Sequence, residues 1–121
     1  MARWALLHHE LPDGSWHYDW MLEDASHPEG ALVTFRVLVR PDMNTVQVFD
    51  AQRLMNHRQA YLDYQGPISG NRGTVRRVAE GTCAIEADGP VFQVLLIEAG
   101  LRWVGVRREP APDLYRFTLQ T

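Results

Sequence analysis

The chain has 121 residues, 45% of them hydrophobic and 22% charged, and carries a formal net charge of −3 at pH 7. This length predicts one domain, residues 1–121, and this composition is typical of a soluble globular protein. The mild acidity excludes a protein coated with basic side chains for general binding to DNA. All twelve cationic residues are arginines, whose planar fork suits phosphate, so a local phosphate-binding face is compatible with this charge.

Neither a membrane protein nor a secreted one is expected. The longest apolar runs, such as Val94–Ile97, are too short to span a bilayer. The first residues lack the apolar region of a signal peptide, because Leu7 is followed directly by His8-His9-Glu10. The single cysteine, Cys83, excludes an internal disulfide and is interpreted as a small strand residue rather than a nucleophile. We therefore expect a cytoplasmic protein.

Two strands are predicted at the start of the chain, Arg3–Glu10 and Trp16–Glu23. The stretch between them, Leu11–Ser15, contains Pro, Asp and Gly and is typical of a turn. Two strands joined by so short a loop form an antiparallel hairpin, which would bring His9 near His17.

The rest of the chain alternates short β-rich stretches with turns that contain Gly or Pro. The polar stretch Asp24–Gly30 is predicted to be a loop with a solvated His27. Ala51–Ala60 lacks β character and is predicted to hold a short helical turn. Gly66–Gly73 has three Gly and one Pro in eight residues, which indicates an irregular loop. Extended segments are predicted at Ala31–Val39, Thr45–Phe49, Tyr61–Gln65, Thr74–Ala79, Thr82–Glu86, Val91–Glu98, Arg102–Glu109 and Leu114–Gln120.

This pattern of short strands and tight turns, without a long amphipathic helix, predicts an all-β fold. An antiparallel barrel and a sandwich both fit it.

The strand His17–Glu23 is expected to be apolar on one face and chemically active on the other, because strand side chains alternate between faces. His17 and Asp19 leave by the same face, so an imidazole and a carboxylate lie two residues apart. Such a pair can supply two ligands to one divalent cation. The apolar face consists of Tyr18, Trp20 and Leu22, and Met21 and Glu23 share the face of His17 and Asp19.

Further residues are needed to complete a site. The upstream candidates are His8 and His9. His57 and Tyr61 are four residues apart, and share a face on either a helix or a strand. Two neutral imidazoles with one carboxylate suit Mn²⁺, Fe²⁺ or Zn²⁺ and leave coordination positions open. From the residues alone, histidines that are solvated or hydrogen-bonded and a barrel-packing role for Tyr61 are the open alternatives, and they are the commoner roles of such residues.

Two motifs together resemble one known family. The stretch His17–Glu23 reads His-Tyr-Asp-Trp-Met-Leu-Glu and resembles the His-Tyr-Asp-Phe-Arg-Leu-Glu signature of the 3′-phosphoesterase domain of bacterial DNA ligase D. The stretch Asn56–Gly66 resembles that family's Asp-His-x-x-x-Tyr-x-Asp-Phe-Glu-Gly block. The loop Ser69–Gly73 is similar to that of small standalone members. A histidine that ends the first strand is also expected, and His9 fits better than His8.

The resemblance implies a compact antiparallel β-barrel of about eight strands and a Mn²⁺-dependent enzyme of DNA repair. Its substrate would be a nucleic-acid 3′ end on a primer-template, from which a terminal ribonucleoside and a 3′-phosphate are removed for non-homologous end joining. By position, His9, His17 and Asp19 would hold the metal. His57 and Tyr61 would be the catalytic residues that contact the scissile phosphate. A separate ligase or polymerase is the implied protein partner.

The chain departs from the family at Met21, where the signature has an arginine. A thioether cannot replace a two-pronged phosphate donor. The alternative prediction is therefore a barrel that binds nucleic-acid ends or a repair protein without turnover. A third reading is a cupin-like metal barrel that acts on a small molecule, although the chain lacks a His-x-His pair.

Overall fold

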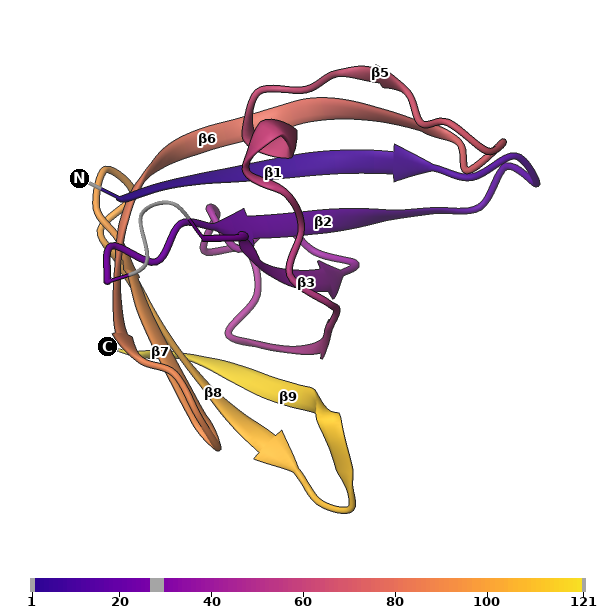
Figure 1. The fold of residues 1–121 in the computed structure, drawn as a ribbon. Coiled ribbons are helices and arrows are strands. Elements are labelled where there is room, and N and C mark those ends of the chain that lie inside the picture. The colour runs from indigo at the N-terminus through magenta and orange to yellow at the C-terminus, as the bar shows by residue number, and fades with distance from the viewer. Residues whose placement is uncertain (1, 27–29, 121) are drawn as a thin grey trace.

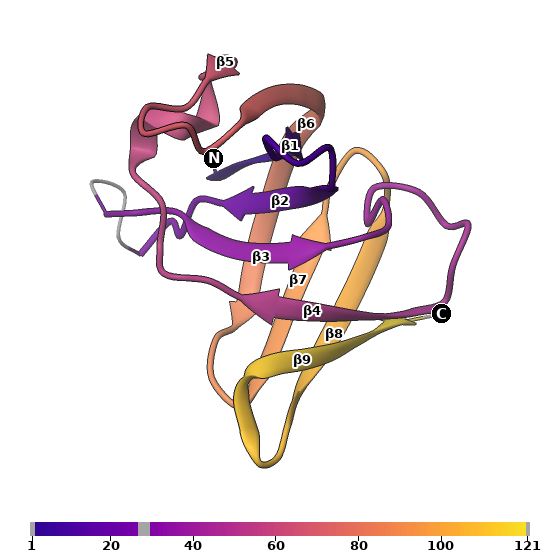
Figure 2. The ribbon, with the colours of Figure 1, turned by 90° about the vertical axis from the view of Figure 1, so that its right-hand side faces the viewer.

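The fold is all-β, as predicted. A computed structural model describes residues 2–26 and 30–120, so the predicted solvated His27 lies outside the described residues. Nine antiparallel strands of this described part form one sheet. The strand order is β1-β2-β3-β4-β9-β8-β7-β6-β5, and an additional pairing of β1 with β6 closes the sheet into a ring (Figures 1 and 2). The strands are β1 (Ala2–Glu10), β2 (Trp16–Leu22), β3 (Val33–Val37), β4 (Val48–Arg53), β5 (Gly66–Pro67), β6 (Thr74–Ala87), β7 (Val91–Leu96), β8 (Leu101–Arg108) and β9 (Ala111–Gln120).

The interior of the ring is filled by large aromatic side chains. Phe35 and Phe117 are fully buried, and their ring centroids lie 5.2 Å apart in an edge-to-face arrangement. Trp103 is also fully buried, and its indole N–H donates to the carbonyl of Pro41 at 2.8 Å. Edge-to-face packing of this kind adds to the stability that comes from burying the rings. The interior is therefore a packed core.

The predicted break between two strands at Glu80-Gly81 is wrong. The two predicted strands Thr74–Ala79 and Thr82–Glu86 form one continuous strand, β6. A Cβ atom at Gly81 would lie 2.7 Å from the Glu98 carboxylate and 2.8 Å from the Trp4 indole nitrogen. Because glycine has no side chain, Trp4 and Glu98 can approach the strand closely at this position. Glycine within a strand often has this role, which differs from its role in turns.

The predicted helical turn exists but lies further along the chain. The 3₁₀-helix η1 spans Gln59–Leu62, so it overlaps only the end of Ala51–Ala60 and replaces the extended segment expected at Tyr61–Gln65. The fourth strand is also shifted, from Thr45–Phe49 to β4. Leu62, buried at 1% exposure, is the residue of η1 that anchors the turn to the sheet. No helix in the described ranges is long and apolar enough to cross a membrane.

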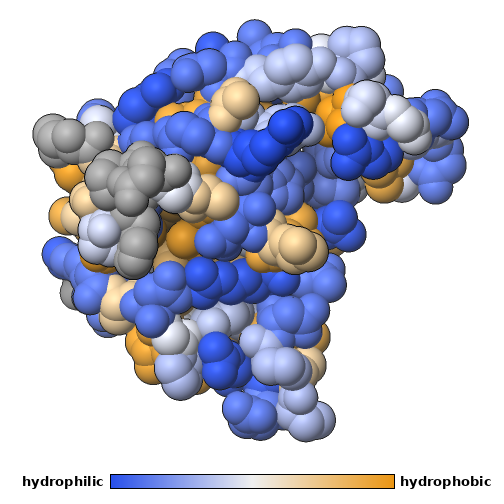
Figure 3. Space-filling model, in the orientation of Figure 1, coloured by the Kyte–Doolittle hydropathy of each residue, from blue (hydrophilic) through white to orange (hydrophobic). Residues whose placement is uncertain are grey.

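The strands β1 and β2 carry apolar side chains on both faces. The apolar side chains on the outer face determine where the site lies. Trp4, Leu6 and Trp20 enter the core of the ring, whereas Leu7 and Met21 leave by the outer face. The segment 54–73, which contains η1 and β5, covers that outer face (Figure 1), and the surface seen from this side is mainly hydrophilic (Figure 3). A second apolar cluster thereby forms outside the ring. Its buried members are Ala5, Leu7, Met21, Leu32, Leu62 and Val75, with Tyr61 and Ile68 packed against them.

Gly105 offers a test of core packing. A Cβ atom there would lie 2.6 Å from the ring of Phe117. Gly105→Ala should therefore lower the free energy of unfolding by about 1–3 kcal/mol, as overpacking of a core does. Gly89→Ala is the matched control, because a Cβ at Gly89 meets nothing within 4 Å. Urea unfolding of both variants measures the difference, and equal stabilities would contradict the packing described here.

Candidate metal centre and adjoining cleft

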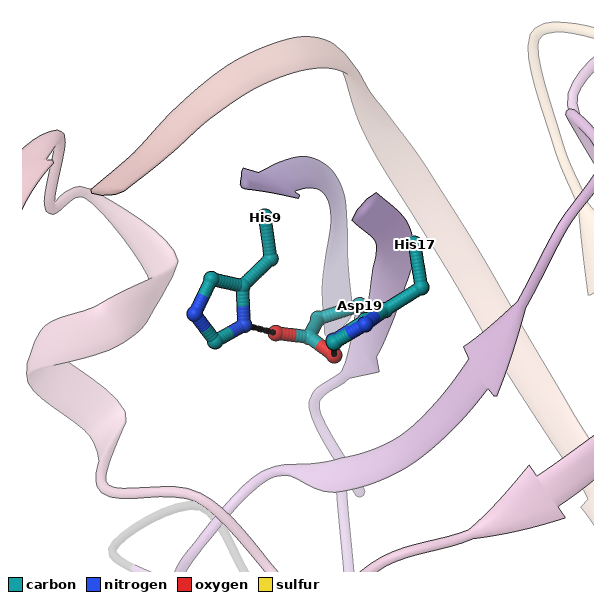
Figure 4. Close-up of side chains that lie close together, drawn as sticks. All are labelled: His9, His17 and Asp19. Atoms are coloured by element: carbon teal, nitrogen blue, oxygen red, sulfur yellow. Dashed lines mark ion pairs between the residues drawn. The ribbon is translucent and has the colours of Figure 1, made fainter. Parts of the chain in front are cut away.

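The register of the first hairpin brings two histidines together. His9 of β1 lies directly opposite His17 of β2, and Leu7 lies opposite Asp19. Directly opposed residues of antiparallel strands point to the same face, and the two imidazole ring centroids are 4.8 Å apart. The three polar side chains converge on the outer face of the sheet (Figure 4). The predicted grouping of His9, His17 and Asp19 is present in the structure.

The three side chains form a compact and largely buried cluster. His9 Nδ1 lies 3.3 Å from Asp19 Oδ2, and His17 Nε2 lies 3.2 Å from Asp19 Oδ1 (Figure 4). One donor atom from each residue lies within 4.8 Å of the other two. The exposed fractions of the side chains are 13% for His9, 5% for His17 and 6% for Asp19. Burial of such groups costs free energy unless each finds a partner.

Three buried atoms of this cluster make no hydrogen bond within the described part of the chain, although both nitrogens lie at ion-pair distance from the carboxylate: His9 Nδ1, His17 Nε2 and Asp19 Oδ1. The other nitrogen of the His9 ring, Nε2, donates its hydrogen to the carbonyl of Arg72 at 2.7 Å. In the neutral ring this bond leaves a bare lone pair on Nδ1, which then faces the carboxylate. A divalent cation between them satisfies both groups, so the residues fit a metal ion of the Mn²⁺, Fe²⁺ or Zn²⁺ type.

Gly73 holds the loop that supplies the Arg72 carbonyl. Its φ of +94° is a left-handed conformation, and a Cβ atom there would lie 2.0 Å from the carbonyl oxygen of Glu10. Only glycine permits both the conformation and this approach of the loop to the end of β1. The Gly-rich stretch therefore orients the His9 ring from outside the sheet, a role that the sequence does not reveal.

A cleft of about 420 Å³ opens beside the cluster. Leu7, Val75 and Ile68 of the second apolar cluster form part of its lining. Most of its polar wall comes from the segment 54–73, which contains both the His57 and Tyr61 pair and the loop Ser69–Gly73. The polar and aromatic residues that line it are His9, Asp19, Asn56, His57, Arg58, Tyr61 and Arg72. The structure thus brings four of the five predicted site residues to one cleft, and His17 adjoins them through Asp19.

His57 is held by both its backbone and its ring. Its backbone forms a two-way bridge with Leu32, with N–H donors at 2.6 Å and 3.0 Å from the opposite carbonyls. Its Nδ1–H donates to the carbonyl of Met55 at 3.0 Å. The ring of Tyr61 lies 5.8 Å away, edge to face. The Nε2 atom of His57 is consequently the ring position at which a proton can be exchanged.

Two arginines line the cleft without a carboxylate partner among the described residues. The Arg72 guanidinium donates to the Ser69 carbonyl at 2.7 Å and to the Ser69 hydroxyl at 3.3 Å. The Arg58 guanidinium lies 5.7 Å from the centroid of the Tyr61 ring. Among the residues that the structure describes, Asp19 is the one carboxylate that lines the cleft. The charge of the cleft therefore favours an anion once a cation occupies the cluster.

Met21 is fully buried in the second apolar cluster and does not line the cleft. The predicted strand face is right, since Met21 follows His17 and Asp19 with period two. Its side chain, however, packs beneath the segment 54–73 rather than facing open space. The cations of the cleft come instead from Arg58 and Arg72.

Two other candidates lie away from the cleft. His8 occupies the opposite face of the hairpin, where its ring stacks on Trp16 at 5.1 Å. Cys83 is buried in the core, and burial raises the pKa of its thiol to about 12. A thiol with such a pKa holds its proton at neutral pH and is a poor nucleophile.

The chain matches no protein-family model, and no curated protein matches it. The resemblance to the 3′-phosphoesterase domain therefore rests on the motif residues themselves, and membership in that family stays a prediction.

Metal binding should stabilise the fold. At a free Mn²⁺ concentration about a hundredfold above Kd, binding to the native state adds about 2.7 kcal/mol to the free energy of unfolding. His17→Ala should abolish this gain, whereas His8→Ala, on the other face of the sheet, should keep it. Thermal unfolding with Mn²⁺ and with a chelator measures the effect. An equal gain in His17→Ala would place the cation elsewhere.

Met21→Arg should destabilise the protein rather than add a phosphate-binding guanidinium group to the cleft. The substitution buries an unpaired charge among apolar side chains, which costs at least about 2 kcal/mol. Met21→Leu is the matched control, since this volume-conserving change costs less than about 1.5 kcal/mol. Chemical denaturation of both variants decides the point. A stable Met21→Arg protein would show that the cluster opens to solvent at this position.

Proposed function

We propose that the chain is a metal-dependent phosphoesterase that acts on nucleic-acid 3′ ends and leaves a 3′-hydroxyl group. The observation that carries the proposal is the meeting of three groups of residues at one cleft. These are a buried cluster with three unpartnered ligand atoms, a histidine with one exchangeable ring position, and two arginines without carboxylate partners. The wider role in DNA repair and end joining, beside a separate ligase or polymerase, follows from the resemblance alone.

The cluster of His9, His17 and Asp19 would hold the divalent cation, Mn²⁺ by the resemblance. When bound, such an ion acts as a Lewis acid that neutralises charge on a phosphoryl oxygen. The protein's contribution is the fixed orientation of its ligands. The Arg72 carbonyl sets the tautomer of His9, and the hairpin register sets the spacing of His17 and Asp19.

The wall of the cleft supplies the remaining chemistry. Because the Met55 carbonyl holds the Nδ1 proton of His57, the imidazolium form can donate only from Nε2. Protonation of the leaving oxygen from this atom is general acid catalysis. The Tyr61 hydroxyl and the Arg58 and Arg72 guanidinium groups are hydrogen-bond donors toward the non-bridging phosphate oxygens.

The alternative of a binding module without turnover was motivated by the loss of an arginine at Met21. Burial of Met21 weakens that motive, because an arginine at this buried position would be desolvated rather than placed on the cleft wall. The cupin-like reading gains no support either. The ring interior is packed with side chains, and the cleft that reaches the cluster lies on the outer face.

The test is removal of a 3′-phosphate from a primer-template in the presence and absence of Mn²⁺. Wild-type protein with Mn²⁺ should release phosphate, and His57→Gln should lower kcat by about 10²–10⁴-fold, the usual contribution of a general acid. Tyr61→Phe keeps the ring and removes one donor, so its effect should be smaller. Arg108→Gln, an exposed substitution on β8, is the control that should retain activity.

Two results would contradict the proposal. Absence of phosphate release by the wild-type protein at every Mn²⁺ concentration would exclude the reaction. Full activity of His57→Gln would leave the reaction in place but remove His57 from it.

A further inference from the structure

The hairpin of β1 and β2 carries a second group of side chains on the face opposite the metal cluster. His8 stacks on Trp16 with ring centroids 5.1 Å apart and an interplanar angle of 22°. Tyr18 meets Trp16 edge to face at 5.3 Å and His8 at 5.7 Å. We call His8, Trp16 and Tyr18 the aromatic triad. The triad lies toward the hairpin end that projects beyond the ring of strands (Figure 1).

Burial separates Trp16 from the other tryptophans of the chain. Trp4, Trp20 and Trp103 are at most 4% exposed, whereas Trp16 is 45% exposed. Tyr18 packs partly against the core, and its direct cross-strand pairing with His8 stabilises the register of the hairpin. That pairing accounts for two of the three rings. It does not account for the large indole surface that Trp16 leaves in water.

The charged side chains on this face determine which ligands it can bind. Arg76 of β6 is paired in register with His8, so both side chains share the face. Arg76 is exposed and has no ion pair among the residues that the structure describes. Glu10, opposite Trp16, is the acidic neighbour and lies one step nearer the hairpin end. The face therefore offers a half-exposed indole on β2 and, on the other side of β1, a guanidinium group on β6 that has no ion pair among the described residues.

We propose that the aromatic triad and Arg76 form a stacking platform for unpaired bases of a nucleic-acid strand. Aromatic side chains stack on every base, and a cation beside them pairs with the backbone phosphate. Identification of the strand with the substrate rests on the proposed function. The aromatic triad alternates along β1 and β2 with the residues of the candidate metal centre. The same hairpin therefore carries the platform on one face and the candidate metal centre on the other.

The test measures binding apart from hydrolysis. The full chain, with chelator and no added metal, is titrated against fluorescein-labelled oligothymidylate of about eight nucleotides, a length typical of such sites, and the anisotropy of the label measures binding in every variant. Trp16 is the indole on which a base can stack, because the other three indoles are buried. Stacking should therefore quench the fluorescence of Trp16. Trp16→Leu should weaken binding about tenfold, whereas Trp16→Tyr, which keeps an aromatic face, should bind nearly as well as wild type. Arg76→Gln should reduce the salt dependence of binding by about one phosphate contact.

The outcomes distinguish the platform from the proposed catalysis. Unchanged affinity in Trp16→Leu and His8→Ala, or capture of a peptide but not of oligothymidylate, would overturn the platform even if phosphate is released from 3′ ends. Affinity lowered in Trp16→Leu and kept in His17→Ala would support it even if the protein hydrolyses nothing. Because Trp16 is half exposed, Trp16→Leu should fold, and circular dichroism verifies this.

Discussion

The pairing of His9 with His17 across the first hairpin is the constraint on which the molecule's chemistry depends. A shift of one residue in this register would send every side chain of one strand to the other face. The two imidazoles would then separate, and the apolar side chains that fill the ring would face the segment 54–73. The same pairing therefore sets the core, the outer apolar cluster and the cluster of His9, His17 and Asp19 together.

Much of the fold and the metal cluster can be predicted from local patterns. Alternation in His17–Glu23 identifies both faces of β2, and the short turn before it predicts the hairpin that adds His9. Gly81 escapes such reasoning, because a glycine within a strand and a glycine in a turn look alike in sequence. What separates them is the approach of Trp4 and Glu98, which are distant in the chain.

The wall of the cleft is harder to predict, for a related reason. His57 and Tyr61 are recognisable from their spacing, yet nothing local to them says that they lie over β1. Their position depends on Leu62 and Ile68 packing on the outer apolar cluster. The alternation of Ala5 and Leu7 with core residues shows that the sheet is apolar on two faces, but not which segment covers the second one. Nor does sequence reveal that a main-chain carbonyl, that of Arg72, orients His9.

The segment 54–73 is attached to the ring by few backbone bonds: the bond from the Leu54 N–H to the Thr34 carbonyl, the bridge of Leu32 with His57 and the two-residue strand β5. A unit held in this way can open at a lower free energy than the ring itself. Opening would remove His57, Tyr61 and the Arg72 carbonyl from the cluster in one event, while the hairpin keeps His9, His17 and Asp19 together. The cluster on the hairpin and the cleft wall on the segment 54–73 would then separate as two units of the same small domain.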